Sequence, residues 1–287
     1  MVKLMTDNIK DFYNKFNYPV FGDFKLSDML KTGARDRSDP SIHWNDFWPN
    51  KNKNEKINIL VAGCGTYQAA IIAAKNKNTN VVGIDVSNKS IEIQKNICKE
   101  EDIQNVTFEI CSILEYQSDT RFDLIICSGV LHHLENPKEN LFHLSTMLKD
   151  DGILSVMLYN YFGRQGVYNM QAIVKLLNLT SDKHGAEKLT KIIDKLPANH
   201  TVNNYIKNNR EVVYFENFMD TFFNPHDVCY TALDIPKLIE GTGLRFNDWL
   251  EMDYDHPIEH NLDVFEKAFY LDSLTEKNSI LSFTLRK

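Results

Sequence analysis

Two glycines and one aspartate form the most specific chemical pattern in this sequence. The apolar run from Ile59 to Ala62 leads into Gly63-Cys64-Gly65, and helix-forming residues follow. Glycine at both positions allows a tight turn that brings the backbone close to a ligand, and the first turn of a helix supplies unpaired N–H groups. Asp85 ends the next apolar run, where its carboxylate can accept hydrogen bonds from both hydroxyls of a ribose. The spacing predicts a site for a nucleotide-derived cofactor.

A second group of candidate residues begins where a later apolar run ends at Tyr159. The segment from Tyr159 to Tyr168 combines aromatic rings, glycines and one cation, Arg164. The guanidinium could bind a carboxylate or phosphate, or form an ion pair, and the rings could enclose an apolar or cationic acceptor. We therefore expect a substrate lid, with the substrate-binding candidates Tyr159, Tyr161, Arg164 and Tyr168.

The segments between these residues predict the sheet that must position them. Short apolar runs alternate with amphipathic segments, which is typical of parallel strands joined by helical crossovers. The predicted strands are 57–62, 81–84, 106–111, 122–127 and 153–159, followed later by 244–249 and 280–285. Helices are predicted near 68–75, 88–99, 137–148, 170–177, 187–196 and 233–239. This order indicates a doubly wound α/β sheet.

Composition narrows the classes of function. The chain has 287 residues and a formal net charge of −7, which argues against broad contact with nucleic acid. Because no apolar stretch is long enough for a signal peptide or a bilayer span, we expect a cytoplasmic protein with no nucleic-acid or membrane partner. The five cysteines are predicted to be free thiols. His256 and His260 flank Pro257 in a predicted loop, and no metal site is expected.

Four motifs in order resemble the class I S-adenosylmethionine (SAM)-dependent methyltransferases. The glycine and aspartate pattern alone would equally suit NAD, but the segments after the fourth and into the fifth strand also match this family, which makes an NAD-dependent oxidoreductase the weaker alternative. The resemblance implies SAM as cofactor and a seven-stranded, mostly parallel sheet with an antiparallel terminal strand. The matching segments are Ile59 to Gln68, Val82 to Ser87, Phe122 to Leu134 and Leu148 to Leu154.

The resemblance also implies an organisation in four parts. Residues 1–55 form an N-terminal arm or lid rich in aromatic residues, and 56–159 form the SAM-binding Rossmann-like core. Residues 160–230 form a helical substrate-cap insertion, and 231–287 return to the core sheet.

Two positions depart from the family pattern. Many members have an acid where this chain has Val61 and a third glycine where it has Tyr67. Backbone carbonyls at the ends of the first and fourth strands are then expected to bind the methionine amino group of SAM. Arg35 and Arg37 are candidates for binding its carboxylate.

Residue-level carry-over from the family gives nine cofactor-binding candidates. Each matches a family position that contacts one portion of SAM. Gly63, Gly65 and Gln68 would face the methionine and ribose portions. Asp85 would bind the ribose hydroxyls, and Val86 would contact the adenine face. Ser112 and Ile113 would meet the adenine edge, and Ser128 and Val130 would lie at the sulfonium region.

Methyl transfer to a small-molecule acceptor is the predicted reaction. His132 and His133 follow the fourth strand and are the candidate catalytic bases, although the family often carries paired histidines here without using either. Tyr18 belongs to a Tyr-Pro pair like those that precede the core in some small bacterial members, and we expect it to fold over the site. The alternatives are an RNA or protein methyltransferase and a non-catalytic SAM-binding regulator. Exposed aromatic residues in the arm would suit a lid or a homodimer interface.

Overall fold

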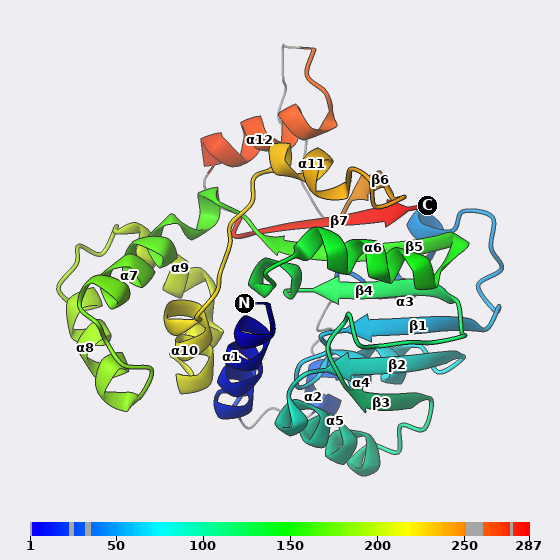
Figure 1. Ribbon diagram of the computed structural model, residues 1–287, viewed down its shortest axis with the longest axis horizontal. Coiled ribbons are helices and arrows are strands. Elements are labelled where there is room, and N and C mark those ends of the chain that lie inside the picture. The colour runs from blue at the N-terminus through cyan, green and yellow to red at the C-terminus, as the bar shows by residue number, and fades with distance from the viewer. Residues whose placement is uncertain (1, 23–25, 32–35, 251–260, 276–277) are drawn as a thin grey trace.

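A seven-stranded sheet forms the centre of the protein in the computed structural model (Figure 1), which describes residues 2–22, 26–31, 36–250, 261–275 and 278–287. The strand order is β3-β2-β1-β4-β5-β7-β6, with β1 to β5 parallel and β7 antiparallel to both of its neighbours. This confirms the predicted fold class. The strands are β1 (Ile57–Ala62), β2 (Thr79–Asp85), β3 (Val106–Ile110), β4 (Phe122–Ser128), β5 (Leu148–Tyr159), β6 (Arg245–Trp249) and β7 (Ile280–Arg286).

Helices cover both faces of the sheet. One face packs against α6 (Pro137–Met147), α11 (Ile235–Ile239) and α12 (Val264–Thr275), and the other against α3 (Pro40–Phe47), α4 (Gln68–Lys75) and α5 (Asn88–Glu100). Because both faces are covered, β1 and β4 are almost continuously apolar and buried. Helix α5 begins where predicted, since Ser87 caps it through a 3.2 Å hydrogen bond from the Ser90 N–H to Oγ.

The insertion after β5 and the start of the chain fold together as a cap. Figure 1 shows α7 (Gln165–Leu176), α8 (Lys183–Ile193), α9 (Thr201–Asn208) and α10 (Phe215–Phe223) at the left, beyond the carboxyl ends of the parallel strands, with α1 (Val2–Lys15) between them and the sheet. Phe12 and Phe16 of α1 share one buried cluster with Val167, Met219 and Phe222. We call α1 and α7 to α10 the cap.

The predicted N-terminal arm therefore lies in two environments. Its first part belongs to the cap, whereas Trp44, Phe47 and Trp48 pack beneath the sheet with β1 and α4. A short helix, α2 (Leu26–Lys31), lies between these parts and contacts α4. Neither α1 nor α12 was predicted from the sequence as a helix.

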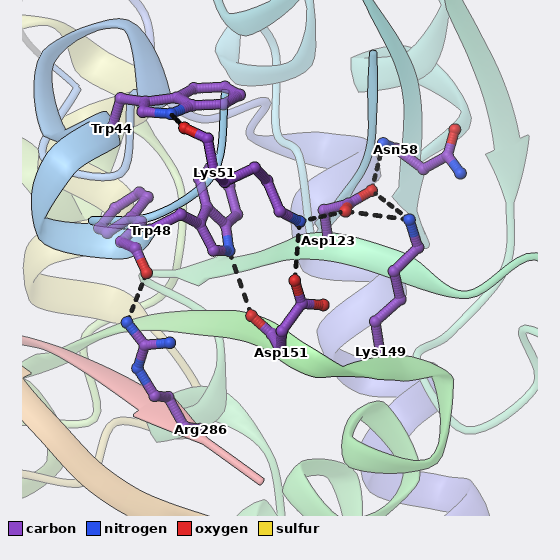
Figure 2. Close-up of polar contacts among 9 residues, drawn as sticks. Trp44, Trp48, Lys51, Asn58, Asp123, Lys149, Asp151 and Arg286 are labelled. Atoms are coloured by element: carbon purple, nitrogen blue, oxygen red, sulfur yellow. Dashed lines mark hydrogen bonds and ion pairs between the residues drawn. The ribbon is translucent and has the colours of Figure 1, made fainter. Parts of the chain in front are cut away.

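Polar contacts hold the second part of the arm to the amino-terminal end of β4. In Figure 2, the side chains of Lys51 and Lys149 both point at the carboxylate of Asp123. Oδ1 of Asp123 accepts from Lys51 Nζ at 2.8 Å, Oδ2 accepts from the Asn58 N–H at 2.9 Å, and Lys149 Nζ lies 2.9 Å from both oxygens. Trp48 adds a 3.2 Å hydrogen bond from Nε1 to the Asp151 carbonyl. We call Lys51, Asn58, Asp123 and Lys149 the Asp123 cluster.

Several sequence predictions concern features outside the sheet. Within the described ranges, no helix combines the length and apolar character needed to cross a bilayer. The same residues contain no group of three or more His, Cys, Asp or Glu side chains placed to hold a metal ion, and all five cysteines are free thiols. His256, His260 and Arg35 lie outside the described residues.

Candidate functional site

A cavity of about 540 Å³ opens at the carboxyl ends of β1, β2 and β4. This is the point where the strand order reverses on either side of β1, and open α/β sheets bind ligands at such points. The structure brings all nine predicted cofactor residues to its walls, together with His133, Tyr18 and Tyr159. The other predicted site residues, His132, Tyr161, Arg164 and Tyr168, do not line it.

The glycine turn forms the floor of this cavity. Gly63 and Gly65 have φ of +73° and +54°, which L side chains rarely adopt. A Cβ on Gly63 would lie 2.4 Å from Val130 Cγ2, and one on Gly65 would lie 2.8 Å from the Tyr18 carbonyl oxygen. Both glycines are therefore required by backbone conformation and by close approach of neighbouring chain.

Asp85 is fixed beside this turn. Its Oδ2 accepts the Gly65 N–H at 2.8 Å, and its Oδ1 accepts the Ser87 N–H at 2.8 Å. Burial raises the pKa of Asp85, and these backbone N–H groups limit the rise. Asp85 lines the cavity, so its carboxylate is placed to accept from hydroxyls of a ligand.

The wall beyond Asp85 is mostly apolar. Val86, Ile113 and Leu114 supply surface suited to a planar base, and Ser112 supplies one polar group. Its Oγ donates to Glu115 Oε2 at 2.8 Å, so toward a ligand the hydroxyl oxygen can act only as an acceptor. An acceptor at this position can pair with an N–H group of a ligand.

The two adjacent histidines lie in different environments. His133 lines the cavity, and its Nδ1 lies 2.8 Å from the His226 carbonyl oxygen. Because a carbonyl only accepts, Nδ1 must carry the hydrogen, and in the neutral ring the lone pair then lies on Nε2. His133 is also close enough to the buried Asp220 to oppose the increase in pKa that burial causes in that carboxyl.

His132 is completely buried, and neither ring nitrogen has a hydrogen-bond partner in the described chain. Its ring stacks on Tyr159 with centroids 3.8 Å apart. Burial, together with the nearby His133, Arg164 and His226, lowers the pKa of His132 well below the ordinary value. Such a ring holds a proton poorly and does not reach the cavity.

Of the predicted lid residues, Tyr159 lines the cavity, whereas Tyr161, Arg164 and Tyr168 do not. Arg164 is 2% exposed, pairs with Asp227 at 3.2 Å and donates to the Tyr205 hydroxyl at 2.7 Å. Its guanidinium lies 3.5 Å from the centre of the Tyr159 ring, on which His132 also stacks. Arg164 thus forms the ion pair considered as its alternative role, while Tyr161 is 42% exposed.

Several cavity residues were not among the predicted site residues, and they include the ionisable side chains of Tyr13, Asp36, Glu211 and His226. Tyr13 donates to Asp220 Oδ1 at 2.9 Å, which ties α1 to α10 next to the cavity. Only Tyr13 had a sequence signal, the Phe12-Tyr13 pair in the aromatic arm. The others stand in segments without a motif and reach the cavity through tertiary folding.

Comparison with known proteins identifies one family. Residues 53–215 match a model described as a methyltransferase domain. An uncharacterized protein of Synechococcus is 29% identical over 211 residues, which cover 69% of this chain and 50% of that protein. Malonyl-[acyl-carrier protein] O-methyltransferase 2 of Ilyobacter polytropus is 28% identical over 149 residues, or 50% of this chain and 56% of the relative. The matches thus span about half the length of these curated relatives.

Solved structures share the fold at low sequence identity. PKMT2 from Rickettsia typhi aligns with a TM-score of 0.69 and 17% identity, over 94% of this chain and 54% of that one. Magnesium protoporphyrin IX methyltransferase (ChlM) from Synechocystis, solved with bound SAH, aligns with a TM-score of 0.54 and 14% identity, over 98% and 100% of the two chains. At these identities the likeness concerns the fold.

Proposed function

This chain belongs to the class I SAM-dependent methyltransferases, and from that premise we propose that it transfers the methyl group of SAM to a small-molecule acceptor. The observation that carries the proposal is the single cavity described above. One half of it has the glycine turn and Asp85, and the other half has His133, Tyr13 and residues of the cap. A cofactor and an acceptor can therefore meet in one cavity.

The residues of the first half fit SAM chemically. The Asp85 carboxylate has the lone pairs that a ribose diol requires, and the apolar wall suits adenine. Gly63 and Gly65 carry no side chain, so their backbone stays open to a ligand. A larger side chain at either position would occupy the space beside it. We assign SAM binding to the nine cofactor candidates.

SAM supplies its own activation when bound, because its sulfonium makes the methyl group electrophilic. The protein must align the acceptor with that methyl group, exclude water and accept a proton where the acceptor has one to lose. We assign the second task to the cap, since α1 contributes Ile9 and Tyr13 to the cavity wall and is joined to α10 by the hydrogen bond from Tyr13 to Asp220.

We assign the proton-accepting role to His133. Its Nδ1–H is held by the His226 carbonyl, which fixes the ring and leaves the Nε2 lone pair for the acceptor's proton. The proton then moves from Nε2 to solvent after transfer. His132 is assigned a packing role between His133 and Tyr159, because its ring is buried and stacked.

Size and charge support a small acceptor rather than RNA or a protein side chain. The cavity of about 540 Å³ lies beneath the cap, and the chain carries a formal net charge of −7, which disfavours contact with phosphate backbones. We also propose a cytoplasmic location and a homodimer as the state to test, with neither nucleic acid nor a membrane as partner.

Calorimetric titration with SAM and with NAD tests the cofactor assignment. We expect micromolar binding of SAM, no binding of NAD, and strong weakening of SAM binding in Asp85→Ala because the ribose loses its acceptor. Acceptor compounds can then be screened for release of S-adenosylhomocysteine. Failure of the folded wild type to bind SAM would contradict the proposal, and binding without turnover on any acceptor would favour the regulatory alternative.

A further inference from the structure

The amino-acid end of SAM needs a negative charge that β1 does not supply. The family pattern often has an acid at the position of Val61, near the cofactor's ammonium group. In this chain Val61 is completely buried among Ile59, Ile126 and other apolar side chains on one face of the sheet. It does not line the cavity, so a carboxylate that joins the expected backbone carbonyls at the ammonium must come from another segment.

The order of the strands indicates where this partner must lie. Asp85 ends β2, and the apolar wall of Val86 and Ile113 lies toward β3. With the ribose at Asp85 and adenine on that wall, the amino-acid end must extend the other way, across β1 toward β4. The turn at Gly63 and the side chain of Ser128 mark this end of the cavity.

Asp36 occupies this end. Its Oδ2 accepts from Gln68 Nε2 at 2.8 Å, which places the carboxylate at the start of α4, directly after the glycine turn. It also lines a smaller adjoining pocket of about 150 Å³ together with Ser128 and Ser155, which belong to β4 and β5. Asp36 thus borders β1 and β4, as the orientation of the cofactor requires.

The surroundings of Asp36 favour a cationic ligand. Within the described chain, its two hydrogen-bond donors are neutral: the Gln68 amide and, at 2.8 Å from Oδ1, the Ser38 N–H. Burial raises the pKa of Asp36 despite these two donors and the nearby Lys75, so the protein compensates its charge only in part. A bound ammonium would supply the opposite charge directly and with a charge-assisted hydrogen bond.

We propose that Asp36 binds the α-ammonium group of SAM and so replaces the acid missing at position 61, an inference that rests on the SAM-dependent function proposed above. The residue comes from the N-terminal segment rather than from the sheet. It makes recognition of the cofactor's amino-acid end depend on a part of the chain outside the strand and turn that bind the nucleoside.

Binding of two matched ligands tests this role without any turnover. One ligand is S-adenosylhomocysteine, and the other is its deamino analogue, 4-(5′-thioadenosyl)butyrate, which keeps the carboxylate and lacks the amino group. In Asp36→Asn, the amide oxygen can still accept the Ser38 N–H, and Gln68 can rotate its own amide to match. We expect affinity for S-adenosylhomocysteine to fall about 10- to 100-fold, while affinity for the deamino analogue stays nearly unchanged.

Glu135→Gln is the matched control, because Glu135 is another carboxylate of the same cavity and lies on an exposed stretch after β4. It should leave the preference for S-adenosylhomocysteine over the deamino analogue intact. Equal losses for both ligands in Asp36→Asn, or no loss for either, would overturn the role of Asp36 while leaving SAM binding established. A folded wild type that binds neither ligand would instead overturn the proposed function.

Discussion

At the scale of single residues, the two neighbouring histidines differ because of what surrounds them. His133 has one ring nitrogen fixed by a carbonyl and lines the cavity, whereas His132 is stacked on Tyr159 and has no polar partner in the described structure. Burial keeps His132 neutral, since it lowers the pKa of the ring. Both histidines are candidate bases in the sequence, but only the environment of His133 suits a catalytic base.

Replacing His133 tests the proposed base. In His133→Gln we expect turnover to fall by about 10²- to 10⁴-fold with an acceptor that loses a proton, because the imidazole lone pair proposed to accept that proton is removed. SAM affinity should change little, since the ribose and the amino-acid end bind elsewhere. Steady-state kinetics and calorimetry measure the two effects separately.

His143→Gln is the control for this substitution. His143 is a histidine of α6 whose Nε2 contacts the Tyr116 carbonyl at 2.8 Å, and it does not line the cavity. Its replacement should leave turnover close to that of the wild type. Equal turnover in His133→Gln and the wild type would contradict the assignment of the base.

At the scale of elements, the N-terminal segment is held over the site by the cap. Asn217 of α10 accepts the Val20 N–H at 2.8 Å and donates to the Val20 carbonyl at 2.7 Å. Thr66, which follows the glycine turn, donates a hydrogen bond to the Pro19 carbonyl. The N-terminal segment therefore contacts both the cap and the region of the glycine turn. The cap and the glycine turn are thus connected through two consecutive residues of the arm, Pro19 and Val20.

Removing this connection should loosen the arm. In Asn217→Ala, Val20 loses both partners, and we expect stability to fall by about 1–3 kcal/mol, because buried groups are left unsatisfied. Amide hydrogen exchange of residues 16–22 should accelerate, as measured by mass spectrometry.

Asn209→Ala serves for comparison, since Asn209 belongs to the same cap but donates only to the Tyr205 carbonyl of α9. Exchange in the arm should stay slow in that variant. If exchange of residues 16–22 were the same in both variants, the arm would be held by other contacts.

At the scale of the whole molecule, the end of the sheet opposite the cavity carries a buried ion cluster. Asp123 is fully buried and receives two lysines and one backbone N–H (Figure 2). Burial by itself would raise the pKa of Asp123, but the hydrogen bonds from Lys51, Asn58 and Lys149 outweigh it and lower the pKa. Because the pKa of Asp123 is lower in the folded protein than in the unfolded chain, the cluster stabilises the fold at pH values above the ordinary pKa of a carboxyl group. This stabilisation is lost as the pH falls through the pKa of Asp123 in the folded protein.

Asp123→Asn should therefore destabilise the protein mainly at neutral pH. We expect a loss of about 3 kcal/mol in the free energy of unfolding, because Lys51 and Lys149 both lose the buried carboxylate that they share. The difference from wild type should shrink as pH falls through the folded pKa of Asp123. Urea titrations at several pH values measure this. Asp150→Asn is the control: its carboxylate is fully exposed, so the free energy of unfolding should hardly change. A loss of stability in Asp123→Asn that does not depend on pH would contradict an electrostatic origin of the stabilisation.

The sequence by itself determined the sheet and the glycine turn with its neighbouring aspartate. Parallel strands buried on both faces must be continuously apolar, and a turn with positive φ and close neighbours requires glycine, so β1, β4, Gly63 and Gly65 are recognisable locally. Asp85 follows because the end of β2 is adjacent to that turn. Each of these signals lies within one element and its immediate connection.

Only the tertiary structure decided the rest of the site. Arg164 was predicted as a lid residue because the sequence does not show its partner Asp227, which lies 63 residues away. Asp36 belongs to no motif, because its contact with Gln68 joins residues 32 positions apart. Likewise, the arm divides between the cap and the sheet according to which apolar surface each part buries. Burial and long-range pairing depend on how elements pack, and local sequence patterns do not contain that information.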